Sequence, residues 1–197
     1  LEPMRTPVTL SGRAVRLEPL AERHLADLAV AGGDRETWTW LFDDHSTPAS
    51  LERWLADALR KAAAGAELPF ATIDIASGRA IGSTRFMALA PEHRRLEIGW
   101  TWVGQPFRRS HVNTEAKFLM LRHAFVALGL HRIALQVFAF NERAIASYRK
   151  SGFVVEGRAF LKLLAGDPAL AVQIINLLCQ RLRWMSARME EATLLPL

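Results

Sequence analysis

Two arginines and a run of polar residues stand where a strand is expected to give way to a helix, in Arg108-Arg109-Ser110-His111-Val112-Asn113-Thr114. A strand-to-helix turn presents unpaired main-chain N–H groups and the positive end of the helix dipole, a combination that suits a pyrophosphate. Arginine adds bidentate donors for phosphate oxygens. The segment predicts an anion site. The alternative is a plain helix start, capped by Asn113 or Ser110, with two solvated arginines.

A second segment whose residues could take part in catalysis runs from Asn141 to Phe153 and reads N-E-R-A-I-A-S-Y-R-K-S-G-F. Asn141 is expected to start a helix on which Ala144 and Tyr148, four residues apart, lie on one face. Tyr148 is the only tyrosine in the chain. An aromatic residue at helical spacing is more often part of a core, so the spacing leaves core packing and catalysis both open.

Glu97 lies in the strand expected over residues 96–103, directly before the arginine-containing turn. Strict alternation predicts one face made of Glu97, Gly99, Thr101 and Val103, and another made of Leu96, Ile98, Trp100 and Trp102. A carboxylate on a face open to substrate can take a proton from an attacking ammonium group. The alternative is a partly buried carboxylate paired with Arg94 or Arg95.

The elements that must position these residues follow from periodicity and turn signals. Strands are expected over residues 8–17, 70–76, 80–89, 96–103 and 131–139, and from Phe153 onward. Helices are expected from Leu20 to the Gly32-Gly33 stop, over 48–64 with Thr47 as N-cap, over 113–128, and after Asn141. This order predicts an α/β (α+β) fold with a mixed, mostly antiparallel sheet flanked by helices.

Length and composition indicate a compact, folded chain: 197 residues, 50% hydrophobic and 23% charged. No apolar run approaches the roughly 20 residues needed to cross a bilayer, and residues 1–10 lack the layout of a signal peptide, so we expect a cytoplasmic protein. The single Cys179 reads as a buried thiol. The scattered histidines show no ligand spacing, and no metal is expected.

The net charge is +5, mostly from arginine. This charge suits a nucleic acid, an acidic protein or a polyphosphate cofactor, and by itself it does not choose among them. No basic helix or aromatic platform motif stands out, so nucleic acid is not expected.

The two chemical segments together resemble the GNAT superfamily of N-acetyltransferases. Arg108 matches the opening of the family pattern Q/R-x-x-G-x-G/A and Asn113 its final small position, whereas His111 stands in place of the glycine. The continuation N-T-E-A-K is similar to the ribosomal-protein N-terminal acetyltransferase branch. Residues 141–153 look like the family pattern N-x-x-A-x-x-x-Y-x-x-x-G-F.

The resemblance implies a GNAT acyl-CoA N-acyltransferase fold and direct acetyl transfer from acetyl-CoA to an amine, with no acetyl-enzyme. Acetyl-CoA would lie between the strand over 96–103 and the strand over 131–139. Glu97 would deprotonate the acceptor, and Tyr148 would protonate the departing thiolate. The implied cofactor-binding residues are Trp102, Val103, Arg108, Arg109, Ser110, His111, Val112, Asn113, Thr114, Asn141 and Ala144.

The acceptor is expected to be a primary amine, on a protein N-terminus or a small molecule. Residues 32–64 would select this acceptor, because acidic residues beside aromatics can hold a cation. The residues concerned are Trp38, Trp40, Phe42, Asp43, Asp44 and Trp54. The same aromatics could simply form core.

The C-terminal segment departs from the family, whose last strand would cover the sheet. Residues 171–192 carry apolar positions at alternating steps of four and three, which predicts one long helix with a heptad seam. The amino-acid sequence of this segment is similar to that of the dimerisation helix of cyclic-nucleotide-receptor-type transcription activators. We expect a GNAT domain over 1–165, a helix over 166–197 and a homodimer through 169–192, with packing over the sheet as the alternative. A non-catalytic dimeric sensor that binds CoA or an anion is the rival function.

Overall fold

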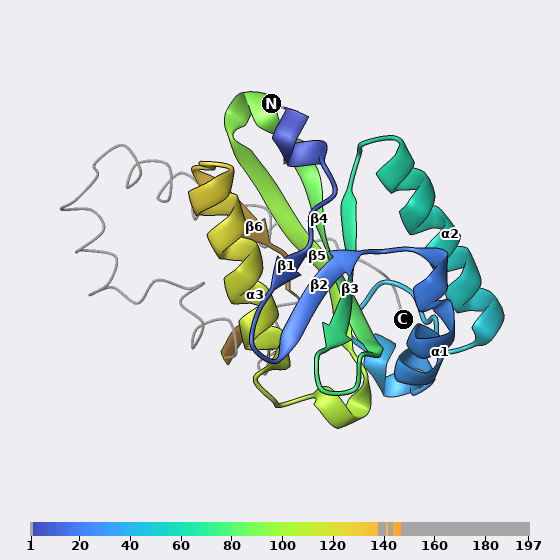
Figure 1. Ribbon diagram of the computed structural model, residues 1–197. Helices are drawn as coiled ribbons and strands as arrows, with labels where there is room; N and C mark the ends of the chain where they lie inside the picture. The colour runs from blue at the N-terminus through green and yellow to red at the C-terminus, as the bar shows by residue number, and fades with distance from the viewer. Residues whose placement is uncertain (1, 138–140, 142–143, 147–197) are drawn as a thin grey trace, which may run out of the picture. The chain divides into compact units, whose positions relative to one another are not determined.

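The computed structural model describes residues 2–137, 141 and 144–146 (Figure 1). All of them lie within the unit Leu1–Ser151. The strand predicted from Phe153, the helix over 169–192 and Cys179 lie outside the described residues. They stay predictions.

Within the described residues, six strands form one sheet in their order along the chain (Figure 1). They are β1 (Leu10–Ser11), β2 (Val15–Pro19), β3 (Leu68–Asp74), β4 (Ala80–Ala90), β5 (Arg95–Val103) and β6 (Arg132–Leu135). Neighbours from β1 to β5 are antiparallel, and β6 joins β5 in parallel. The mixed, mostly antiparallel sheet that the sequence predicts is confirmed.

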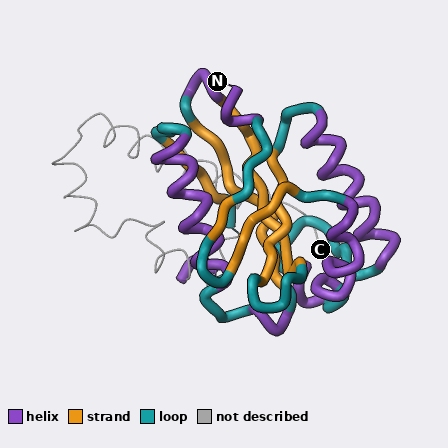
Figure 2. Tube along the Cα trace, in the orientation of Figure 1, coloured by secondary structure: helices purple, strands orange, loops and turns teal. Residues whose placement is uncertain are grey.

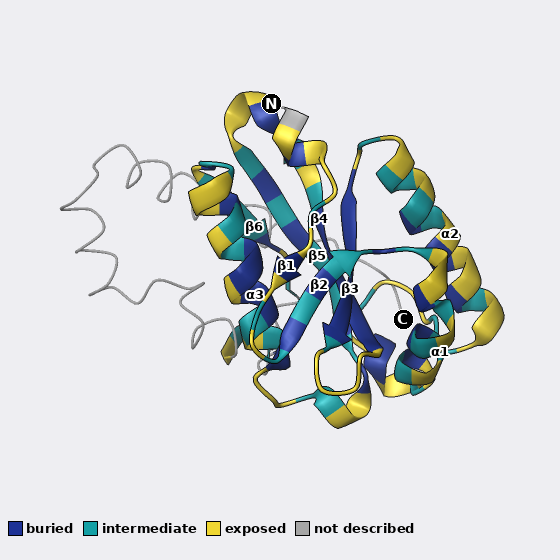
Figure 3. Cartoon of the chain, in the orientation of Figure 1, coloured by how far each residue is buried: buried dark blue, intermediate teal, exposed yellow. Residues whose placement is uncertain are grey.

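Helices cover both faces of this sheet (Figure 2). Helices α1 (Leu25–Gly32) and α2 (Pro48–Ala63) pack on one face, where the core joins their apolar side chains to Ala71, Ile73 and Trp102. Helix α3 (Val112–Arg122) packs on the other face, and a π-helical turn, η6 (His123–Ala127), continues it. Because both faces are covered, six of the seven residues of β3 are buried (Figure 3).

Five short 3-10 turns connect the described elements. They are η1 (Glu2–Arg5), η2 (Glu22–His24), η3 (Arg35–Trp38), η4 (Pro91–His93) and η5 (Gln105–Phe107). Two of them frame the candidate site, since η3 follows α1 and η5 leads from β5 toward α3.

The start and end of helix α2 agree with those that the sequence predicts. The Thr47 hydroxyl accepts the main-chain N–H of Ser50 at 3.4 Å, and Pro48 takes the first helical position, where its missing N–H costs nothing. Gly65 follows with φ of +66°, the left-handed conformation that glycine adopts without strain.

The single strand predicted over residues 8–17 is wrong, because the chain reverses inside it. The main-chain N–H of Gly12 donates to Val15 O at 2.9 Å, and this turn separates β1 from β2. The Glu115 carboxylate, from α3, accepts the N–H groups of Arg13, Ala14 and Val15 at 2.6, 2.9 and 3.0 Å. A partner a hundred residues away thus supports the turn, and local alternation could not reveal it.

Candidate active site

A β-bulge in β5 sets the directions of the side chains around the candidate site. Ser83 of β4 pairs with Trp102, and Arg85 pairs with Gly99, so β5 carries one extra residue over this stretch. Trp100 sits in the bulge with φ of +49°, a conformation that is rare for an aromatic residue and typical of functional sites.

The bulge makes the predicted alternation of β5 wrong beyond Gly99. Thr101 faces α3, where its hydroxyl lies 2.8 Å from that of Thr84. Trp100 and Trp102 pack on the α1 and α2 face, the face that also holds Glu97 and Gly99. Because the extra residue shifts the alternation of side chains by one position, both tryptophans lie on the same face of the sheet as the Glu97 carboxylate.

The outer edge of β5 is open where the predicted cofactor would lie. Strand β6 pairs only with residues 95–98, so within the described residues the rest of β5 has β4 as its strand partner. The N–H of Gly104 donates to Ile81 O, and antiparallel pairs alternate between bonded and non-bonded. The N–H of Val103 therefore points away from β4, toward the open edge, and that of Trp102 points toward β4.

The two arginines of the turn differ in their surroundings, since the guanidinium of Arg108 is bound by other residues and Arg109 is exposed. Arg108 donates to Asp34 Oδ2 at 3.1 Å and to Thr37 Oγ1 at 2.5 Å, and it lies 3.5 Å from Glu36 Oε2. Its side chain therefore ties η3 to the turn. Arg109 is exposed and has φ of +63°.

His111 adopts an ordinary helical conformation, with φ of −70° and ψ of −13°. The residue with positive φ in this turn is Arg109, so the absence of a glycine at 111 costs no backbone strain.

The start of α3 offers main-chain donors. The Ser110 hydroxyl donates to Phe107 O at 2.7 Å and accepts the N–H of Val112 at 3.2 Å. The N–H groups of Asn113 and Thr114 have no acceptor among the described residues. With the helix dipole they give the start of α3 an arrangement that suits an anion, and the anion site itself stays a prediction.

The second chemical segment is described only at its beginning. Asn141 is buried, and its Oδ1 accepts the N–H of Ala144 at 3.1 Å while its carbonyl accepts that of Ile145. Asn141 is thus the helix cap that the sequence predicts. Tyr148 lies outside the described residues.

Glu97 lies on the sheet face that it shares with Met87 of β4. Its Oε2 accepts a hydrogen bond from Gln136 Nε2 at 3.1 Å. No ion pair to Arg94 or Arg95 is present among the described residues, and the guanidinium of Arg94 donates to Gly129 O. The carboxylate is half-exposed, so water or substrate can reach it.

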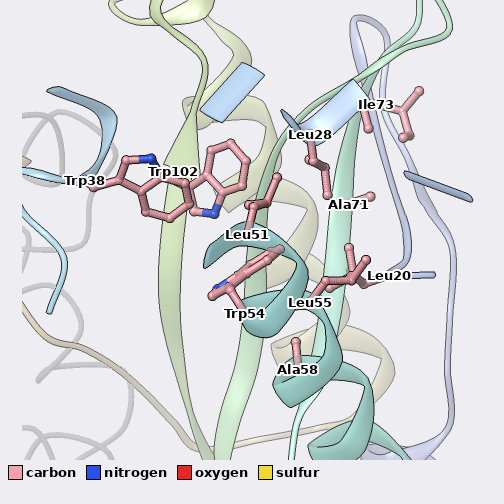
Figure 4. Close-up of a cluster of buried hydrophobic side chains, with 11 residues drawn as sticks. Leu20, Leu28, Trp38, Leu51, Trp54, Leu55, Ala58, Ala71, Ile73 and Trp102 are labelled. Carbon is pink, nitrogen blue, oxygen red and sulfur yellow. The ribbon is translucent and has the colours of Figure 1, made fainter. Parts of the chain in front are cut away.

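Four tryptophans and His45 form an aromatic cluster on the α1 and α2 face of the sheet, and Figure 4 shows three of them, Trp38, Trp54 and Trp102. This tryptophan cluster comprises Trp38, Trp54, Trp100, Trp102 and His45, with ring centroids 4.8 to 6.5 Å apart between neighbours. Trp38, Trp54 and Trp102 are buried core residues.

The predicted acceptor segment is thus divided between core and surface. Trp38 and Trp54 serve the core, whereas Trp40 and Phe42 are 41% and 67% exposed. A cavity of about 260 Å³ opens beside the core residues and is lined by Arg35, Trp38, Thr39, Leu41, Phe42, Asp43 and Asp44. Arg35 Nε lies 2.9 Å from Asp44 Oδ2, and hydrogen bonds from Ser46 lower the pKa of the Asp44 carboxyl.

Sequence reasoning missed two residues of this site, Arg85 and His45. Arg85 is 1% exposed, and its guanidinium lies 5.6 Å from the Trp54 ring centroid and 5.1 Å from that of Trp100. It is the only charged residue of the strand 80–90, a signal that could have indicated it. Burial lowers the pKa of the His45 imidazole, so that the neutral ring is favoured.

The described residues hold no group of three or more His, Cys, Asp or Glu side chains that could bind a metal ion. No helix in the described part of the chain is long and apolar enough to span a membrane.

Known proteins resemble this chain in sequence. The profile of the acetyltransferase (GNAT) domain matches residues 14–154. YoaA of Bacillus subtilis, named an uncharacterized N-acetyltransferase, is 39% identical over 77 residues, which are 39% of this chain and 43% of YoaA. The chain thus spans less than half of that relative. YdaF of the same bacterium, whose name assigns it provisionally to the ribosomal N-acetyltransferases, is 26% identical over 144 residues, 73% of this chain and 78% of YdaF.

Solved structures resemble the chain in fold. A GCN5-related N-acetyltransferase from Brucella melitensis superposes with a TM-score of 0.68 at 31% identity, over 74% of this chain and 66% of that one. RimJ of Mycobacterium smegmatis, solved with CoA-disulfide, superposes with a TM-score of 0.61 at 23% identity, over 74% and 75%. The profile match, the site geometry and these folds agree: the chain belongs to the GNAT family of acetyltransferases.

Proposed function

We propose that the protein transfers the acetyl group of acetyl-CoA to a primary amine, on a peptide N-terminus or a small molecule, by direct attack in a ternary complex. The observation that carries this proposal is the pairing of two features. The unpaired N–H groups at the start of α3 suit a pyrophosphate, and the open edge of β5 beside them suits the extended arm that carries the thioester.

The cofactor would be held mostly by main-chain groups. The N–H groups over residues 109–114 would bind the pyrophosphate, and the outward N–H of Val103, next to Trp102, would polarise the thioester carbonyl. Arg108 would act by shaping the turn, because Asp34 and Thr37 already hold its guanidinium. Asn141 would start a helix whose small Ala144 leaves space for pantetheine.

Two residues would move protons. Glu97 would take the proton of the acceptor ammonium, directly or through a water, since an amine must be neutral to attack a carbonyl. Tyr148 would return a proton to the CoA thiolate; this assignment rests on the sequence pattern of residues 141–153.

The test is release of free CoA thiol from acetyl-CoA in the presence of peptide and small-molecule amines. Glu97→Gln and Tyr148→Phe should each lower kcat by roughly 10²- to 10⁴-fold, the usual worth of a positioned acid or base. The matched control is Glu92→Gln, at an exposed position of η4, which should keep the wild-type rate. Wild-type rates in both site variants would remove these two residues from the mechanism.

The acceptor amine would approach through the cavity lined by Trp38, Phe42, Asp43 and Asp44. Carboxylates beside aromatic rings favour a cation, and Asp43→Asn should raise KM for the amine more than it changes kcat. An unchanged KM would place the entrance elsewhere.

The rival function, a dimeric CoA-binding sensor, would show binding of acetyl-CoA in calorimetry with no turnover on any acceptor. We further propose that residues 169–192 form a homodimer. Light scattering at micromolar concentration tests it, and a monomeric mass would contradict it.

A further inference from the structure

Lys117 reaches from α3 to the sheet at the bulge in β5. Its side chain is 1% exposed, and its Nζ donates to Thr84 Oγ1 at 3.0 Å and to Thr101 Oγ1 at 2.5 Å. Thr84 lies on β4 opposite the place where β5 carries its extra residue. The ammonium group thus joins the two strands at the bulge itself.

The hydroxyls of Thr84 and Thr101 also bond to each other. The Thr84 hydroxyl donates its one proton to Met120 Sδ at 3.6 Å, so at the 2.8 Å contact between the two hydroxyls Thr101 is the donor. Each hydroxyl oxygen then accepts a hydrogen bond from Lys117. This lysine network, made of Lys117, Thr84, Thr101 and Met120, forms only while the Thr101 side chain points toward α3.

The lysine network is an unfavourable way to fill a buried space. Hydroxyls alone hold the Lys117 ammonium among the described residues, and a buried charge without an ionised partner costs free energy that an apolar side chain would not. Some proteins retain buried charged groups because these groups specify one conformation against another. Lys117 has such an alternative to exclude, the strand without its bulge.

Without the bulge, the side chains of β5 would follow the strict alternation that the sequence predicts. Thr101 would turn to the α1 and α2 face, and Trp100 would enter the buried layer between α3 and the sheet. Lys117 would then lose one of its two oxygen acceptors while staying buried, which raises the free energy of this register. The lysine network therefore favours the bulged register.

This register decides which main-chain group reaches the open edge of β5. The N–H of Val103 points outward because the residues beyond the bulge are shifted by one place relative to β4. In a strand without the bulge, the N–H of Val103 would turn toward β4 and that of Trp102 would turn outward in its place. The location of the outward donor thus depends on the bulge.

We infer that Lys117, through Thr101, fixes the bulged register of β5 and so positions the outward N–H of Val103 for the thioester carbonyl. Lys117 is a positioning residue, since its contacts are to Thr84 and Thr101 and it lies below the surface. The inference rests on the proposed acetyl transfer for its purpose. The effect of Lys117 on the register can be measured without turnover.

The kinetic test measures kcat, and KM for acetyl-CoA, by release of CoA thiol from the full-length protein. Lys117→Met should lower kcat about 10- to 100-fold, the usual effect of a hydrogen bond to a charged group, and should change KM less, because the donors at the start of α3 stay in place. The matched control Lys61→Met removes a lysine paired with Asp57 near the surface and should keep the wild-type kcat. An unchanged kcat in Lys117→Met would overturn the positioning role.

Thr101 allows a conservative pair of variants. Thr101→Val removes the hydroxyl at nearly constant shape and should lower kcat as Lys117→Met does, whereas Thr101→Ser should recover most of the lost rate. The double variant Lys117→Met/Thr101→Val should lose little more than either single variant, because both break the same link. Losses that multiply would contradict action of Lys117 through Thr101.

Amide hydrogen exchange, followed by NMR on the protein without substrate, reports the register. In the wild-type protein the N–H of Trp102, which points toward β4, should exchange at least about 10-fold more slowly than that of Val103. Lys117→Met should reduce or reverse this ratio while unfolding at the same or a higher urea concentration at pH 7. A variant of lower stability with an unchanged ratio would show that Lys117 serves the stability of the fold alone.

The two readouts separate this inference from the proposed function. An unchanged exchange ratio in Lys117→Met overturns the role of the lysine in the register, whatever the kinetics show. Absence of CoA release on every acceptor would refute acetyl transfer and with it the purpose of the positioning. In that case a changed exchange ratio would still support the control of the register by Lys117.

Discussion

Lys117 lies wholly buried between α3 and the sheet, where its Nζ donates to the hydroxyls of Thr84 and Thr101 at 3.0 and 2.5 Å. No carboxylate within the described residues pairs with it. Burial therefore lowers the pKa of the Lys117 ammonium to about 7, far below its ordinary value of 10.5. This lysine belongs to the N-T-E-A-K run, where the sequence offered no sign that it is buried.

Lys117→Met should raise the free energy of unfolding at pH 6 to 7 and lose this advantage as pH rises. Between the folded pKa, about 7, and the unfolded value of 10.5, the unfolded chain binds more protons. The wild-type stability should thus increase by about 1.4 kcal/mol per pH unit in this window, and the variant should lack this slope.

Urea denaturation from pH 6 to 9.5 measures both slopes. The control is Lys61→Met, which removes an ammonium paired with Asp57 near the surface and should keep the wild-type slope. Parallel slopes for the wild-type protein and Lys117→Met would contradict a lowered pKa of the Lys117 ammonium in the folded protein.

At the scale of elements, α3 connects the two halves of the candidate site through its charged side chains. Its first turn offers N–H groups to a phosphate, Glu115 holds the turn between β1 and β2, and Lys117 holds Thr101 in the bulged strand β5. Helix α3 thus contacts both the β1–β2 turn and the bulged strand.

Glu115→Gln should destabilise the fold by about 1 to 3 kcal/mol, because an amide has one acceptor oxygen for three N–H groups. Burial alone would raise the pKa of Glu115, but the hydrogen bonds from Arg13, Ala14 and Val15 outweigh it and lower the pKa. The contribution is therefore present above the unfolded value of 4.5 and is lost as pH falls through the lower folded value.

Guanidinium denaturation at pH 7 and pH 3 checks this prediction, with the exposed Glu52→Gln on α2 as control. The difference between the wild-type protein and Glu115→Gln should shrink at pH 3. A difference that is equal at both pH values would argue against a role for the charge.

At the scale of the whole molecule, binding and stability are coupled if acetyl-CoA occupies the α3 and β5 edge. Acetyl-CoA at 100 times its Kd should raise the free energy of unfolding by about 2.7 kcal/mol, since only the folded chain has the turn over 108–114. Thermal unfolding with increasing acetyl-CoA measures the shift in Tm. Adenosine, which lacks the pyrophosphate, should shift it far less, and equal shifts would contradict binding through the turn.

The sequence by itself determined most of the elements and the family patterns, but not the division of residues 8–17 into two strands. Periodicity and caps located α2 almost to the residue, because Thr47, Pro48 and Gly65 act within a few residues of themselves. Local sequence signals and the family motifs likewise predicted the order of strands and helices, the turn before α3 and the Asn141 cap.

Only the tertiary structure decided what depends on partners distant in the chain. The bulge at Trp100 reversed the predicted faces of β5, since an extra residue in a strand shows only against its neighbour. The binding of Arg108 by Asp34, the burial of Lys117 and the contact of Arg85 with Trp54 each need groups from separate elements. Membership of the GNAT family could thus be predicted from the sequence, whereas these contacts between separate strands and helices could not.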